Sequence, residues 1–170
     1  MAEGLFRRRL TERGIGASVR SCGLVTEGQP ASAHSVSAMA RRGIDIEAHR
    51  SRLLERSLVH GADLVVGMER QHVREAVVLD PDAFIKSFTL PELVRRGRAI
   101  GERKPAEPVG DWLARAAAGR LPTDLLGHDP ADEIADPIGR SAKRYEQTAT
   151  ELESLVHAAV DLLFPDPPRD

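Results

Sequence analysis

Residues 62–68 (Ala-Asp-Leu-Val-Val-Gly-Met) form a short, largely apolar run of strand length that is bounded by glycines. A strand that is covered on both faces shows such a run, whereas a half-exposed strand alternates apolar and polar residues. Covered strands occur in parallel sheets, because the crossover helices lie on the two sides of the sheet. This segment restricts the possible folds more than any other, and it predicts a parallel sheet flanked by helices.

Helical and strand-like patterns alternate along the rest of the chain. Local patterns predict helices at residues 2–13, 32–42, 48–58, 69–75, 90–101 and 109–118. They predict two further strands, at residues 17–22 and 84–88. Strands that alternate with helices are typical of the α/β class.

The C-terminal part of the chain carries the strongest helical pattern. Residues 121–137 are rich in Asp, Pro and Gly and are expected to form a loop. Apolar residues then recur every three or four positions from Ala142 to Leu163, which predicts an amphipathic helix of about 24 residues. Docking on the sheet and coiled-coil pairing are both compatible with this spacing. We expect a single domain over residues 1–164 and a frayed tail over residues 165–170.

Composition and charge exclude several classes of function. The net charge is −2, so no overall positive field favours nucleic acid. No apolar run is long enough to span a membrane, and the first residues place their charges after the apolar positions, the reverse of a secretory signal. We therefore expect a cytoplasmic protein without nucleic-acid or membrane partners. The single cysteine excludes an internal disulfide, and the six histidines lack the spacing of a metal site, so no metal is expected.

The dipeptide Asp136-Pro137 precedes the long helix and is a candidate site of acid catalysis. A carboxyl group held in a loop beside the sheet could protonate a leaving group. The alternative is structural, with Asp136 as the helix cap and Pro137 in its first turn. The dipeptide by itself is a weak signal, because Asp-Pro also occurs at Asp80, Asp129 and Asp166.

Cys22 is the only thiol in the chain and lacks the surroundings of a nucleophile. A cysteine that attacks phosphorus needs glycines, backbone N–H groups and an arginine close by, at the N-terminus of a helix. The sixth residue after Cys22 is Gly28 rather than arginine. We therefore expect Cys22 to be a small buried residue at the end of a strand.

Several short segments follow one another in an order that is known from one enzyme family. These segments are Met1–Phe6, Ser21–Leu24, Gly28–Ala31, His49–Arg52, Ala62–Glu69 and Asp136–Gly139. They resemble segments of the low-molecular-weight protein-tyrosine phosphatases. The first resembles the start of the helix that follows the family's Cys-x5-Arg-Ser-Pro loop, and the last resembles its Asp-Pro-aromatic-Gly loop. Together the segments cover most of residues 1–160, and their order makes the resemblance specific.

The resemblance implies a three-layer α/β fold of the phosphatase I-like kind, in which helices flank a parallel sheet. It implies that Asp136 is the general acid and base in phosphomonoester hydrolysis through a phosphocysteine, without metal or organic cofactor. It also implies that Val25 and Ile138 line the substrate slot and that Ser21 orients the phosphate-binding loop. The expected substrate is a phosphorylated protein or a smaller phosphoester. Ile138 replaces an aromatic residue of the family, which weakens the expectation of a phosphotyrosine preference.

The family's nucleophile has no counterpart in this sequence. In the family, the loop cysteine, the loop arginine and the first, central strand precede the position of Met1, and Cys22 lies where alanine is usual. We therefore expect the reading frame to continue upstream of Met1, and the chain as given to lack that strand and to be inactive alone. The alternative is a non-catalytic binding or regulatory module with the family's fold.

Overall fold

The computed structural model describes residues 1–166, which cluster into two compact units. Unit 1 comprises Met1–Leu53 and Ala135–His157, and unit 2 comprises Leu54–Ile134 and the chain from Ala158 on. The tail predicted at 165–170 falls mostly outside the described residues. The single domain expected over residues 1–164 stays a prediction. No helix of the described chain combines the length and the apolar character that a membrane span requires.

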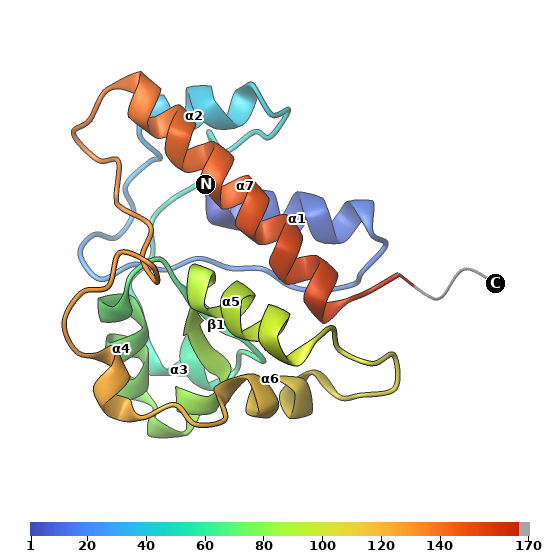
Figure 1. Cartoon of the computed structure of the whole chain (residues 1–170). Coiled ribbons are helices and arrows are strands. Elements are labelled where there is room, and N and C mark those ends of the chain that lie inside the picture. The colour runs from blue at the N-terminus through green and yellow to red at the C-terminus, as the bar shows by residue number, and fades with distance from the viewer. Residues whose placement is uncertain (167–170) are drawn as a thin grey trace. The chain divides into compact units, whose positions relative to one another are not determined.

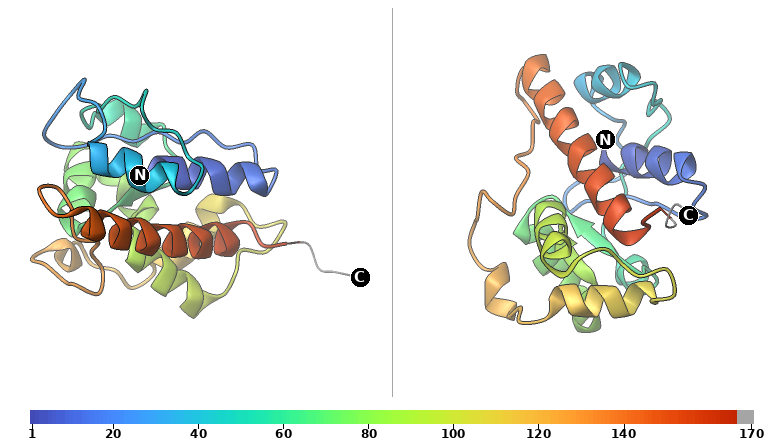
Figure 2. Two further views of the ribbon diagram at one scale, coloured as in Figure 1. Left: turned by 90° about the horizontal axis from the view of Figure 1, so that it is seen from above. Right: turned by 45° about the vertical axis from the view of Figure 1, so that its right-hand side comes forward.

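Unit 1 is built from helices and extended loops. It contains α1 (Ala2–Glu12), α2 (Ala33–Ala40) and the larger part of α7 (Ala142–Leu163). The α7 helix lies beside α1 in each of the views (Figures 1 and 2). Ion pairs join the end of α2 to α7, because Arg41 and Arg42 both contact Glu146 at 2.6 Å. These pairs hold the pKa of the Glu146 carboxyl below its ordinary value.

Unit 2 contains the sheet. Strand β1 (Val65–Gly67) pairs in parallel with β2 (Ser87–Thr89), and Val66 lies opposite Phe88. The connecting helix α4 (Arg70–Leu79) packs against both strands, and α5 (Leu90–Ile100) packs against β2. The short helix α3 (Arg56–His60) contacts α4. The predicted α/β fold, with a small parallel sheet flanked by helices, is confirmed.

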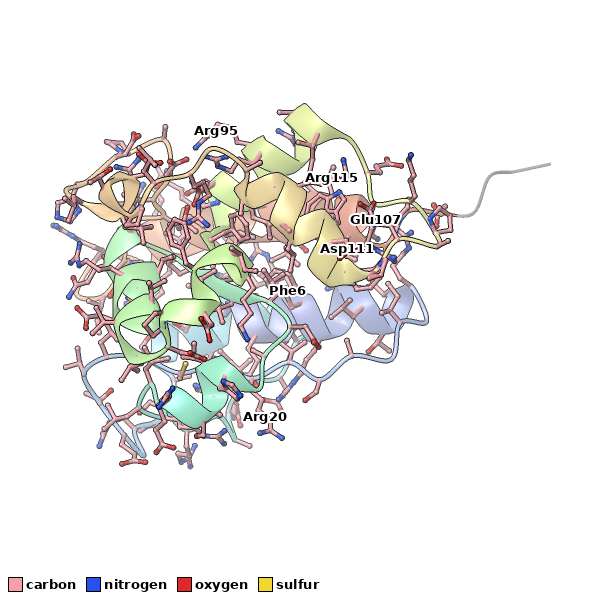
Figure 3. The ribbon with its side chains drawn as sticks, turned by 90° about the horizontal axis from the view of Figure 1, so that it is seen from below. Phe6, Arg20, Arg95, Glu107, Asp111 and Arg115 are labelled. Atoms are coloured by element: carbon pink, nitrogen blue, oxygen red, sulfur yellow. The ribbon has the colours of Figure 1, made fainter. Side chains whose placement is uncertain are left out.

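The core of unit 2 includes a buried tryptophan. Trp112 of α6 (Val109–Ala117) is fully buried, and its indole N–H donates to the carbonyl of Gly101 at 3.0 Å. A Cβ added to Gly97 of α5 would lie 2.9 Å from the Trp112 ring, so a side chain at that position would displace the indole. Arg115 of α6 forms an ion pair at 2.8 Å with Glu107, which lies in the connection between α5 and α6 (Figure 3).

Helices with a long periodic pattern were predicted well. The structure has α1, α2, α4, α5, α6 and α7 at or within a few residues of the predicted positions, and β1 lies inside the predicted apolar run. Val65 and Val66 are nevertheless only partly buried, although the run predicted a strand covered on both faces. The reason is that the sheet of residues 1–166 has two short strands, so each strand has a free edge.

Three predictions of secondary structure are wrong, and two of these errors concern pairing between distant segments. Residues 48–58 are not a helix, because Arg50 and Leu53 form bridges with Pro30 and Gly23 and helical structure begins only at Arg56. Residues 17–22 form no strand, since this segment has no ladder partner and only Gly23 makes a single bridge. The strand predicted at 84–88 starts at Ser87, because a 3-10 helix (Pro81–Lys86) takes up the preceding residues.

Candidate active site

The loop that carries Asp136 is a tight turn whose own residues fix its conformation. The Oδ1 atom of Asp136 accepts from the N–H of Ile138 at 2.9 Å, which is the hydrogen bond of an Asx turn. The carbonyl of Pro137 then accepts from the N–H of Arg140 at 2.9 Å. Gly139 has φ +72°, a left-handed value that a side chain would strain. Pro137 is buried, so the turn is anchored while Asp136 and Ile138 stay exposed.

The geometry excludes the structural alternative for Asp136. Helix α7 begins at Ala142, so Asp136 lies well before the helix and does not cap it. The other Asp-Pro pairs differ in their surroundings, since Asp80 is buried against His60 and Asp129 is paired with Arg70 at 2.9 Å. Within the described residues, the only hydrogen bond of the Asp136 carboxylate is to the N–H of its own turn. Asp136 therefore presents a carboxyl group that is available to a ligand.

A surface hollow lies beside this carboxyl group. It is lined by Asp136, Ala135, Arg140, Ser141 and Arg144, all of unit 1. The sequence interpretation passed over Arg140 and Arg144. The sequence feature that could have identified them is a pair of arginines near the start of the predicted helix. Acidic side chains are favoured at that position, so two cations there are unusual.

Ser21 belongs to a polar cluster at the start of α1. Its hydroxyl donates to the Oε2 atom of Glu3, in the first turn of the helix. Arg7 lies 2.5 Å from the other oxygen of Glu3, and the Nδ1 atom of His49 lies 3.7 Å from Oε2. Sequence reasoning did not single out Glu3, which collects these three polar side chains. The role expected for Ser21, which is to orient a phosphate-binding loop, stays a prediction.

The structure places Val25 in the same unit but does not join it to Asp136 by any contact described for residues 1–166. Its side chain is 87% exposed, on the loop that follows Gly23. Ile138 is 71% exposed and lies within the Asp136 turn. Both residues can offer an aliphatic surface to a ligand, and neither can stack on an aromatic ring as a phenylalanine or tyrosine would.

The expectation that Cys22 is buried at the end of a strand is wrong. The residue is exposed, because the segment that precedes it pairs with no strand. Partial desolvation raises the pKa of the Cys22 thiol above its ordinary value, and the positive charge of Arg52 opposes this shift in part. A raised thiol pKa means less thiolate at neutral pH, which is the opposite of nucleophile activation.

This shift predicts how Cys22 reacts with iodoacetamide. Since only the thiolate reacts, we expect alkylation at neutral pH to be slower than that of free cysteine, with a midpoint of the rate against pH above the ordinary thiol pKa. Mass spectrometry of the time course measures both quantities. Arg52→Gln should raise the midpoint further, because it removes the opposing charge. A midpoint below that of free cysteine would contradict the assignment of Cys22 as an unactivated thiol.

No three histidine, cysteine, aspartate or glutamate side chains of the described chain are grouped so that they could hold a metal ion. The expected absence of a metal and of an organic cofactor stays a prediction.

Comparison with known proteins gives consistent matches. A family model described as low molecular weight phosphotyrosine protein phosphatase matches residues 1–98. A probable low molecular weight protein-tyrosine-phosphatase, EpsP of Ralstonia solanacearum, is 38% identical over 120 residues, which cover 70% of this chain and 80% of that protein. The protein-arginine-phosphatase of Bacillus subtilis strain 168 is 27% identical over 167 residues, which cover 98% of this chain and 89% of that protein.

Solved structures point the same way. The low molecular weight protein tyrosine phosphatase of T. tengcongensis has a TM-score of 0.70 at 28% identity, covering 95% of this chain and 88% of that chain. A YwlE arginine phosphatase mutant with a phosphorylated active site serine also has a TM-score of 0.70 at 28% identity, covering 97% of this chain and 87% of that chain.

Proposed function

Because the chain belongs to the low molecular weight phosphotyrosine protein phosphatase family, we propose that its residues form the acid-donating part of a protein phosphatase and that Asp136 is the general acid. The observation that carries this proposal is the Asp136 turn. It exposes a carboxylate that has no cation partner within the described residues, and its conformation is fixed by the buried Pro137 and by Gly139. A group held in this way can transfer a proton in the transition state without reorganising first.

The proposed reaction has two steps, and its nucleophile is the thiolate of a Cys-x5-Arg loop of the family's kind. Attack of this thiolate on phosphorus breaks the bond between phosphorus and the leaving atom, which keeps the electron pair and takes the proton of Asp136. Water then attacks the phosphocysteine, Asp136 accepts a proton from this water, and the bond between sulfur and phosphorus breaks. The 170 residues contain no such loop. Their proposed contribution is therefore Asp136 and the two residues that line the substrate slot, Val25 and Ile138.

The proposed substrate is a phosphorylated protein. Two relatives support two different phosphorylated side chains, since one is a probable tyrosine phosphatase and the other an arginine phosphatase. Val25 and Ile138 offer aliphatic surfaces, and Ile138 stands where the family has an aromatic residue, so stacking on a phosphotyrosine ring contributes little in this protein. Phosphoarginine is therefore the second candidate, and competition between phosphotyrosine and phosphoarginine peptides would separate the two.

The general-acid role can be tested in a fusion that places a first strand and a Cys-x5-Arg-Ser-Pro loop of the family in front of Met1. In this fusion, Asp136→Asn should lower kcat roughly 100-fold or more for alkyl phosphates, because poor leaving groups need a proton in the transition state. An activated aryl phosphate, such as a nitrophenyl ester, should lose far less. A series of phosphate esters of increasing leaving-group pKa measures this difference as the slope of log kcat against the leaving-group pKa, which should be steeper in Asp136→Asn.

The matched control is Asp129→Asn, which changes an Asp-Pro pair whose carboxylate is held by Arg70. This variant should leave the slope unchanged. Equal losses for all leaving groups in Asp136→Asn would remove the general-acid assignment and favour the alternative of a non-catalytic binding module.

The cytoplasmic location stays part of this proposal. The distribution of a fluorescent fusion between cell fractions would test it.

A further inference from the structure

The hollow beside Asp136 carries positive charge that the protein does not use for its own structure. The guanidinium groups of Arg140 and Arg144 are exposed, and within residues 1–166 neither has an ion pair or a hydrogen bond. Elsewhere in unit 1, by contrast, Arg41 and Arg42 both pair with Glu146. The side chains that line the hollow include one carboxylate, that of Asp136.

The position of these arginines is unfavourable for helix α7. Cations near the start of a helix oppose the helix dipole and therefore lower the stability of the helix. The first turn of α7 has no acidic residue to offset them. A pair of charges that lowers the stability of the helix and has no partner in the described chain is suited to bind an anionic group from outside.

The nature of that group follows from the direction of the reaction. This step rests on the proposed function, in which Asp136 protonates the leaving atom. The leaving group of a protein phosphatase is the substrate protein itself, so the residues next to the phosphorylated side chain must pass the Asp136 turn. Arg140 and Arg144 line the same hollow as Asp136. They are therefore placed to contact the substrate chain.

We propose that Arg140 and Arg144 are specificity residues, which select phosphoprotein segments with aspartate or glutamate next to the phosphorylated residue. A guanidinium group donates in a planar fork that matches a carboxylate. Two such groups around one hollow can accept one or two acidic side chains. Neutral and basic segments gain nothing there, and basic ones are repelled.

The preference can be measured by binding to the 170-residue protein, without turnover. The probes are fluorescein-labelled phosphotyrosine peptides with glutamates on both sides, the same peptides with glutamines, and both without phosphate. Fluorescence anisotropy should give a Kd roughly 3- to 10-fold lower for the glutamate peptides, because exposed ion pairs are individually weak. The preference should appear with and without phosphate, and it should disappear in about 0.5 M salt, where the screening length falls to a few ångströms.

The double variant R140Q/R144Q should abolish this preference. The matched control R20Q/R56Q removes two exposed arginines elsewhere, and it should keep the preference. Circular dichroism of both variants checks that the fold is retained. Asp136→Asn should strengthen binding of the glutamate peptides, because it removes the like charge that lines the hollow.

Three results would overturn the proposal: equal binding of glutamate and glutamine peptides, a preference that survives in R140Q/R144Q, or a preference that appears only with phosphate. None of them bears on the leaving-group test of Asp136, which uses other substrates and another readout. Failure of the specificity proposal and failure of the proposed function are therefore distinguishable.

Discussion

A protein made of these 170 residues should show neither a burst nor turnover with an aryl phosphate. The chemistry needs a thiolate in a phosphate-binding loop, and the only thiol is Cys22, which is exposed and has a raised pKa. Loss of the nucleophile lowers the rate of such enzymes by at least roughly 10⁴-fold. Stopped-flow and steady-state assays with a nitrophenyl ester would measure both phases against buffer alone.

The fusion that carries the family loop is the positive control for this result, and it should recover turnover. Cys22→Ser should change the turnover of neither the fusion nor the 170-residue protein. Turnover by the 170 residues that Cys22→Ser removes would make Cys22 the nucleophile, and the assignment of the chemistry to a separate loop would then be wrong.

Trp112→Ala should lower the free energy of unfolding by about 3–5 kcal/mol, which is the range for truncating a buried aromatic side chain to alanine. Trp112 is fully buried, its N–H bonds to the carbonyl of Gly101, and α5 approaches its ring at Gly97. The change leaves a cavity and an unpaired carbonyl group. This loss is a large fraction of the roughly 5–15 kcal/mol that stabilises a typical domain.

Guanidinium unfolding followed by circular dichroism measures this effect. Trp112→Phe should cost less than the alanine variant, because it keeps most of the ring volume and loses the hydrogen bond and a smaller part of the packing. Val78→Ala should change the unfolding midpoint little, since Val78 is 70% exposed. A loss below about 1 kcal/mol in Trp112→Ala would mean that the core of unit 2 does not depend on this ring.

The candidate site was predictable only in part. The Asp-Pro dipeptide and its family context drew attention to Asp136, but the sequence did not separate its carboxylate from those of Asp80 and Asp129. The structure separates them by their partners, because His60 and Arg70 occupy the other two. The role of Asp136 in catalysis stays a proposal.

The sequence by itself determined the helices α5, α6 and α7 and the location of β1. Their patterns of apolar residues extend over many consecutive positions, and a helix satisfies its own backbone groups within one segment. Local information was therefore sufficient, and the predicted class of α/β fold is correct.

Only the tertiary structure decided how distant segments meet. The bridges of Arg50 to Pro30 and of Leu53 to Gly23 replaced a predicted helix, and the meeting of Ser21 with Glu3 had no sequence signal. The hollow that Asp136 and Arg144 line together was likewise not predicted from the sequence. Strand pairing and side-chain clusters need partners from elsewhere in the chain, and the choice of partner depends on the packing of the whole fold rather than on neighbouring residues.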